Sequence, residues 1–121
     1  MKVSIASNEV YRKFQEYLKI YPSRKAAFRA AKRDGNIPIS QHPEMVVIPN
    51  TDFGDQLGLD ERNVRLYVFN IIVGIIAIEY HIREDREAFY GSSEGNQGSH
   101  FNSGEPPGKL KKHHYWKDDN H

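Results

Sequence analysis

An apolar stretch in the middle of the chain, divided by Gly74, places the strongest constraint on the fold. Residues 65–73 and 75–83, on either side of this glycine, are rich in Val, Ile, Tyr and Phe, which favour β-strands. The longest apolar run, Ile71–Ile78, has eight residues, whereas a membrane-spanning helix needs about 20. We therefore expect a β-hairpin with a tight turn at Gly74 and no membrane partner.

The two faces of the second strand of this hairpin differ in polarity. Successive side chains of a strand point to opposite faces of the sheet, so alternate residues share a face. One face carries Ile76, Ile78, Tyr80 and Ile82, and the other carries Ala77, Glu79, His81 and Arg83. We expect the apolar face to be buried in the core and the polar face to line a cleft.

Two helices are expected before the hairpin. One apolar stripe at helical spacing is formed by Tyr11, Phe14, Leu18 and Tyr21. Ser23 is a typical N-cap for a second, alanine-rich helix, which Gly35 ends. Short strands are also expected at Met45–Ile48 and His113–Trp116.

This order of elements predicts a single domain of the α+β class. The expected architecture is two N-terminal helices within about residues 8–35, followed by an antiparallel sheet of about four short strands within about residues 44–116. A chain of 121 residues suits one domain with one modest core. The acidic segment 44–61 is expected to be mostly loop, and the sequence indicates no role for it.

Positive charge is concentrated in the N-terminal part of the chain. Residues 1–35 carry nine Lys and Arg against three Asp and Glu, although the formal net charge of the whole chain is only +1. A stripe of cations at helical spacing, suited to a phosphate backbone, is formed by Lys25, Arg29, Lys32 and Arg33. His81, on the polar face of the hairpin, is a further candidate for substrate binding. A solvated helix face and a docking surface for an acidic partner are the alternatives.

Residues suited to acid–base chemistry gather in the last third of the chain. They are Arg83, Glu84, Asp85, His100, Asn102, His113, His114 and Tyr115. His100 and Asn102 lie in the Gly-rich and Ser-rich segment 91–108, which is expected to be a functional loop. His113 and His114 are consecutive in a strand, so only one of them is expected to face the site. Nuclease chemistry needs a base, an acid and a positive charge, which this set supplies without a metal.

The same residues also allow a metal site. His100, Asn102, His114 and Asp85 are a set of nitrogen and oxygen donors for a divalent cation, Mg²⁺ or Zn²⁺, against a phosphate. The absence of cysteine from the sequence excludes disulfides, cysteine-ligated zinc and thiol catalysis. A metal-free site is favoured, so no cofactor is expected.

Two ordered motifs resemble a known family of bacterial toxin domains. Ser23–Asp34, followed by Ile37-Pro38 and Ser40-Gln41-x-Pro43, is similar to the family's entry segment. Gly95–Asn102, which reads Gly-Asn-Gln-Gly-Ser-His-Phe-Asn and precedes His114-Tyr115, is similar to its second signature. The family consists of C-terminal domains of large secreted bacterial proteins, namely the Rhs, contact-dependent inhibition and LXG toxins. The resemblance covers roughly residues 23–116.

The resemblance implies an antibacterial cytotoxic endonuclease that is paired with a cognate immunity protein. Such domains are commonly described as HNH or endonuclease VII-like polymorphic toxins, and some similar domains as ribonucleases. They are released from a larger secreted or cell-surface protein and act in the cytoplasm of the target cell. The matched motifs imply site roles for His100, Asn102 and His114. A monomer, or a 1:1 complex with the immunity protein, is expected.

The sequence departs from this family where many relatives carry further histidines. The matching stretch Ile82–Gly91 contains none, which disfavours a metal-binding HNH centre. Helices followed by an antiparallel sheet are more similar to the barnase–colicin type of metal-free ribonuclease. We therefore expect a ribonuclease with Glu84 as base, His100 as acid and Arg83 as phosphate clamp. A metal-dependent DNase and a non-catalytic module that binds nucleic acid or a partner are the alternatives.

Overall fold

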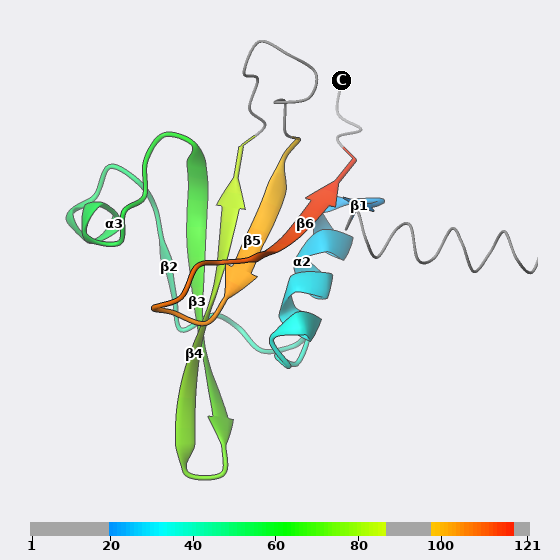
Figure 1. The fold of residues 1–121 in the computed structure, drawn as a ribbon, viewed down its shortest axis with the longest axis vertical. Coiled ribbons are helices and arrows are strands. Elements are labelled where there is room, and N and C mark those ends of the chain that lie inside the picture. The colour runs from blue at the N-terminus through cyan, green and yellow to red at the C-terminus, as the bar shows by residue number, and fades with distance from the viewer. Residues whose placement is uncertain (1–19, 87–97, 118–121) are drawn as a thin grey trace, which may run out of the picture.

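The computed structural model describes residues 20–86 and 98–117, which form one sheet and two helices (Figure 1). The strands are β1 (Ile20–Tyr21), β2 (Met45–Val47), β3 (Asn63–Val73), β4 (Ile76–Asp85), β5 (His100–Gly104) and β6 (Lys112–Trp116). The helices are α2 (Arg24–Asp34) and α3 (Asp52–Gln56). The strand order is β1-β6-β5-β4-β3-β2. Because β1 is parallel to β6 and the other neighbours are antiparallel, the sheet is mixed.

The predicted hairpin around Gly74 is confirmed by the pairing of β3 with β4. The pairing continues to Val73 and Ile76, so Gly74 and Ile75 alone form the turn. Gly74 has a φ of 64°, a conformation that glycine adopts without strain. The neighbouring strands β2 and β5 pair only with the proximal parts of the hairpin, so its tip projects beyond them (Figure 1).

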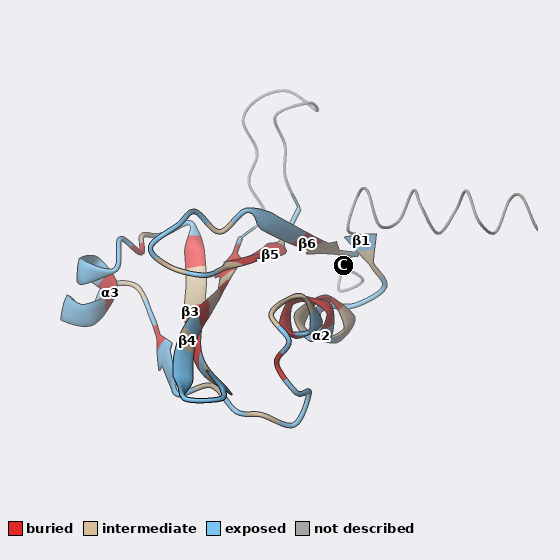
Figure 2. Cartoon of the chain, turned by 60° about the horizontal axis from the view of Figure 1, so that its bottom comes forward, coloured by how far each residue is buried: buried red, intermediate tan, exposed pale blue. Residues whose placement is uncertain are grey.

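Helix α2 covers one face of the sheet (Figure 2). The hydroxyl of Ser23 accepts a hydrogen bond from the backbone N–H of Ala26 at 3.1 Å, as expected of an N-cap. A Cβ added at Gly35 would lie 2.6 Å from the ring of Tyr80, so glycine lets the helix end approach the sheet closely. The core between helix and sheet comprises Ala27, Ala31, Ile37, Phe69, Tyr80, Ile82 and Phe101. A smaller apolar cluster on the opposite face comprises Val47, Leu59, Leu66 and Val68.

The predicted order of two N-terminal helices followed by about four strands is wrong. Residues 8–19 of the first expected helix lie outside the described residues, and its expected end, Ile20–Tyr21, is strand β1. Pairing with β6 accounts for this strand, because an open sheet edge offers hydrogen bonds to an extended backbone. The second described helix, α3, comes between β2 and β3 in the sequence, within the acidic segment 44–61. The α+β class still describes the structure broadly.

The segment 91–108, expected to be a loop, contains strand β5 in the middle of the sheet. Residues 87–97 lie outside the described residues. Apart from Phe101, β5 consists of His, Asn, Ser and Gly, which gives it little strand propensity. It pairs with β4 on one side and β6 on the other, and Phe101 is fully buried. Pairing and burial therefore override local propensity here.

The two other predicted strands correspond to β2 and β6, with small differences at their ends. Among the described helices, none is long and apolar enough to cross a membrane.

Candidate functional site

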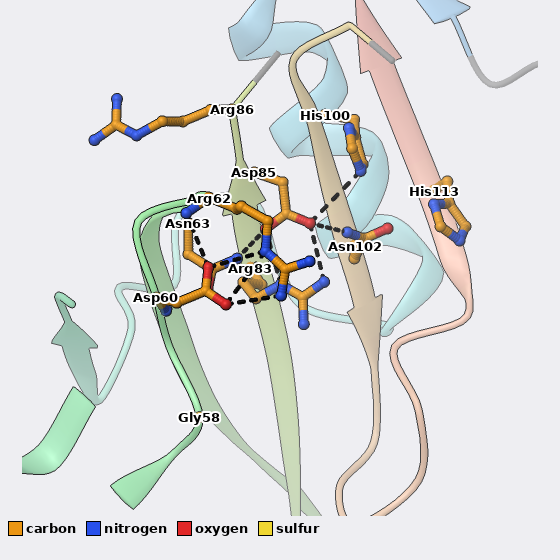
Figure 3. Close-up of a pocket in the computed structure, with 10 residues that line it drawn as sticks. All are labelled: Gly58, Asp60, Arg62, Asn63, Arg83, Asp85, Arg86, His100, Asn102 and His113. Atoms are coloured by element: carbon orange, nitrogen blue, oxygen red, sulfur yellow. Dashed lines mark hydrogen bonds and ion pairs between the residues drawn. The ribbon is translucent and has the colours of Figure 1, made fainter. Parts of the chain in front are cut away.

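A polar pocket opens on the face of the sheet opposite α2 (Figure 3). Its lining comprises Gly58, Asp60, Arg62, Asn63, Arg83, Asp85, Arg86, His100, Asn102 and His113. Strand alternation explains this position, because Ile82, next to Arg83, and Phe101, between His100 and Asn102, point into the core below α2. The pocket brings together four residues that the sequence predicted as catalytic: Arg83, Asp85, His100 and Asn102.

Asp85 is the central hydrogen-bond acceptor of the pocket. Its Oδ1 accepts from Nδ2 of Asn63 at 2.7 Å and from Nε of Arg83 at 2.8 Å. Its Oδ2 accepts from Nη2 of Arg83 at 2.9 Å and from Nδ2 of Asn102. Because these donors occupy the carboxylate, Asp85 is suited to orienting its neighbours rather than to taking a proton from a substrate.

His100 is held between Asp85 and the carbonyl group of Gly98. Its Nδ1 lies 2.8 Å from the Gly98 oxygen, and because a carbonyl only accepts, Nδ1 carries a proton. Its Nε2 lies 3.6 Å from Oδ2 of Asp85. The ring packs on Tyr115, with 4.6 Å between the ring centroids. Nε2 is therefore the nitrogen of His100 that can exchange a proton at the pocket.

His113, and not His114, is the histidine of β6 that faces the pocket. Its ring centroid lies 5.8 Å from that of His100. Desolvation, with a contribution from nearby His100, lowers the pKa of His113 below its ordinary value. Burial, with a contribution from Asp85, raises the pKa of Tyr115, which keeps its phenol neutral. The sequence indicates that only one histidine of the pair faces the site, but choosing between them requires knowing which face of β6 meets α2.

Glu84 and His114 lie on the opposite face, against α2. Oε1 of Glu84 accepts from Nη2 of Arg24 at 2.7 Å, and Oε2 accepts from Nε of Arg24 at 3.0 Å. This hydrogen bond raises the pKa of Arg24. His114 is fully buried, and its Nε2 lies 2.6 Å from Oδ2 of Asp34. The predicted convergence of Glu84 and His114 with His100 therefore does not occur, because strand alternation directs them to the helix.

The cationic stripe of α2 does not border the pocket. Lys32 is only 4% exposed, and its Nζ donates to the carbonyl oxygens of Ile39 and Gln41, each at 2.7 Å. Desolvation lowers the pKa of this buried amine. Lys25, Arg29 and Arg33 are exposed on the helix, which lies behind the sheet as seen from the pocket (Figure 3). The predicted role of Lys32 in binding substrate is thus replaced by a structural one.

His81 is on the pocket side of β4, but it is not one of the lining residues. Its Nε2 lies 2.9 Å from Oε2 of Glu79, so its nearest charged partner belongs to its own strand.

Three residues that line the pocket were not identified from the sequence, namely Asn63 and the arginines Arg62 and Arg86. Asn63 begins β3, where it is buried beside Asp85. Nε and Nη2 of Arg62 donate hydrogen bonds to the two carboxylate oxygens of Asp60, and these bonds lower the pKa of Asp60 to about 2. Nε of Arg86 donates to the carbonyl oxygen of Glu61 at 3.1 Å. No local motif marks these residues, because the approach of the 58–63 segment to the end of β4 is a tertiary contact.

The residues named for a divalent cation do not converge, because His114 is on the helix face while His100, Asn102 and Asp85 face the pocket. Within the described ranges, no group of three or more His, Cys, Asp or Glu side chains is arranged to hold a metal ion. No protein-family model, curated protein or solved structure matches the chain. The chemistry of the pocket and the two sequence motifs are therefore the features that bear on function.

Proposed function

We propose that this chain is a metal-independent endoribonuclease that cleaves RNA by acid–base chemistry at the pocket around Asp85. The observation that carries the proposal is the pair of imidazoles, His100 and His113, whose centroids are 5.8 Å apart on one polar face. Arg83 and Arg86 are among the residues that line the same pocket, and Asp85 holds the guanidinium of Arg83 there. Two groups that transfer protons, next to positive charge, match the needs of phosphodiester cleavage in RNA.

His113 acts as the general base in this scheme. Its lowered pKa favours the neutral imidazole at pH 7. The ring removes the proton of a ribose 2′-hydroxyl, whose oxygen attacks the adjacent phosphorus. The bond from phosphorus to this 2′-oxygen forms as the bond to the 5′-oxygen of the next nucleotide breaks. The products are a 2′,3′-cyclic phosphate and a 5′-hydroxyl.

His100 acts as the general acid. Since Nδ1 donates a hydrogen bond to the carbonyl oxygen of Gly98, the proton given to the leaving 5′-oxygen comes from Nε2. Asp85 balances the charge of the imidazolium from 3.6 Å. Arg83, which Asp85 orients, stabilises the negative charge that develops on the phosphoryl oxygens. The scheme keeps the acid and the clamp expected from the sequence and moves the role of base from Glu84 to His113.

The two sequence motifs support a biological setting for this activity. His100 and Asn102, which end the Gly-rich motif, both line the pocket. We propose that the chain is the cytotoxic domain of an interbacterial polymorphic toxin, released from the C-terminus of a larger secreted or cell-surface protein. It would degrade RNA in the cytoplasm of the target cell. Because Arg62, Arg83 and Arg86 border the pocket, the cognate immunity protein is expected to cover it with an acidic surface.

Cleavage assays test the proposal directly. The purified protein is incubated with a single-stranded RNA and with plasmid DNA, each with and without EDTA. We expect RNA cleavage that survives EDTA and leaves 2′,3′-cyclic phosphate ends, detected by mass spectrometry. DNA cleavage that EDTA abolishes supports a metal-dependent DNase instead. If the protein cleaves neither nucleic acid, the result supports a non-catalytic binding module instead.

Matched histidine variants locate the activity in the pocket. His100→Gln and His113→Gln are each expected to lower kcat/KM for RNA by roughly 10²–10⁴-fold, the usual contribution of a general acid or base. His42→Gln, at an exposed position outside the pocket, is the control and should cleave as the parent protein does. Equal activity of all three variants would contradict the assignment.

A further inference from the structure

The amide oxygen of Asn102 is a buried acceptor at the edge of the pocket. Asn102 is only 2% exposed, and its Oδ1 has no hydrogen-bond partner within the described part of the chain. The orientation of the amide is determined by Asp85, because a carboxylate accepts hydrogen bonds and must therefore face Nδ2. Oδ1 is consequently directed away from Asp85, toward the side of the pocket where His113 lies (Figure 3).

His113 is the neighbour best placed to supply the missing donor. It lies directly opposite Asn102 in the register of β5 and β6. Side chains at opposed positions of an antiparallel pair share a face, with about 5 Å between their Cβ atoms. A neutral imidazole carries one N–H donor and one unprotonated nitrogen, so a single hydrogen bond decides which nitrogen is which. A rotation of the exposed His113 ring is enough to direct an N–H at Oδ1.

We propose that Asn102 is a positioning residue for His113, whose ring N–H donates to Oδ1 of Asn102 in the conformer that reacts. The hydrogen bond selects one imidazole tautomer and leaves the other ring nitrogen unprotonated, directed at the pocket. Asn102 thus connects two parts of the site, since its Nδ2 binds Asp85 and its Oδ1 orients the base. The inference deepens the proposed ribonuclease function and rests on it for the role of His113.

Histidine side-chain ¹⁵N NMR tests the hydrogen bond without any substrate. In the unmodified protein, at a pH where His113 is neutral, we expect one tautomer of its ring to dominate. A mixture of tautomers in the proportions found for a free histidine side chain would overturn the proposal before any variant is made. In Asn102→Ala the preference is expected to be lost, with the ring reverting toward that mixture.

Asn63→Ala is the matched control for this variant. Asn63 also donates its amide N–H to Asp85, at 2.7 Å, but it is on β3, away from His113. Both variants remove one amide donor from the same carboxylate, whereas only Asn102→Ala removes the acceptor for His113. An equal change of the His113 tautomer in both variants would show that the effect passes through Asp85, and would overturn the proposal.

Cleavage kinetics add a second readout. We expect Asn102→Ala to lower kcat for RNA about 10-fold more than Asn63→Ala does, with KM nearly unchanged, since a misoriented base affects the chemical step. A raised KM with an unchanged His113 tautomer would instead mean that Oδ1 binds substrate, which contradicts the proposal. If the protein cleaves no RNA, the tautomer measurement still decides whether Asn102 orients His113, so the two failures are distinguishable.

Discussion

Asp85 and His100 face each other across β4 and β5, with Oδ2 of the aspartate 3.6 Å from Nε2 of the histidine. Strand register creates this contact, since 15 positions separate the two residues in the sequence. Asp85 also accepts from Asn63, Arg83 and Asn102, so one carboxylate orients most of the pocket. The arrangement assigns proton transfer to the imidazoles and orientation to the aspartate.

Asp85→Asn is expected to destabilise the fold as well as the site. The amide replaces one acceptor oxygen with a donor, so it cannot serve all the N–H groups that now converge there, and Arg83 loses its counter-charge. We expect the free energy of unfolding to fall by about 1–3 kcal/mol, measured by urea denaturation. Asp52→Asn, at an exposed position of α3, is the control. An equally small effect of both changes would mean that the network around Asp85 adds little stability.

The pH dependence of cleavage should report His113. Its ring is influenced by His100 on β5, by Arg83 and Asp85 on β4 and by His114 on its own strand, and desolvation is the largest cause of its lowered pKa. A lowered pKa means that the neutral, proton-accepting form persists to lower pH. The acidic limb of the kcat/KM profile should therefore have its midpoint below about 6.5, the ordinary value for histidine. A midpoint above that value, or a limb that persists in His113→Gln, would rule out His113 as the titrating base.

Glu84→Gln tests whether the face of β4 that packs on α2 contributes to stability rather than to catalysis. The carboxylate is bonded to Arg24 and is 6% exposed, so its loss should lower the free energy of unfolding by about 1–3 kcal/mol. The kcat for RNA should change less than about threefold, whereas removal of a general base typically costs 10²-fold or more. Thermal denaturation and single-turnover cleavage measure the two effects. A stable variant that has lost activity would restore Glu84 as the base.

Lys32→Met and Lys25→Met test the two kinds of lysine on α2. The buried amine of Lys32 donates to two carbonyl oxygens, which lose their donor in the variant, so we expect a loss of about 1 kcal/mol. Lys25 is exposed, and its replacement should change stability by less than about 0.5 kcal/mol. Neither change should alter KM for RNA, because α2 is behind the sheet. A raised KM for Lys25→Met would place substrate on the helix after all.

Local signals predicted the elements with strong patterns and failed where pairing decides. The cap at Ser23 and the stop at Gly35 predict α2 well, and the residues around Gly74 predict the hairpin. Ile20–Tyr21 and β5 were missed because their extended conformation depends on strands far away in the sequence. The error at Glu84 has a different cause. Alternation along β4 places Glu84 on the same face as Tyr80 and Ile82, which was expected to be buried, so the pattern of the strand itself disfavoured Glu84 as a base in the cleft.

The amino-acid sequence by itself determined the local conformations and the residues that share a face within each strand, because backbone sterics, capping and side-chain alternation act over a few neighbouring residues. Only the tertiary structure decided which faces meet. The order of β4, β5 and β6 brings Asp85, His100, Asn102 and His113 into one pocket, and the packing of α2 buries Glu84, Lys32 and His114 on the other side. Strand register and helix packing depend on burial and hydrogen bonding between distant segments, which no local pattern specifies.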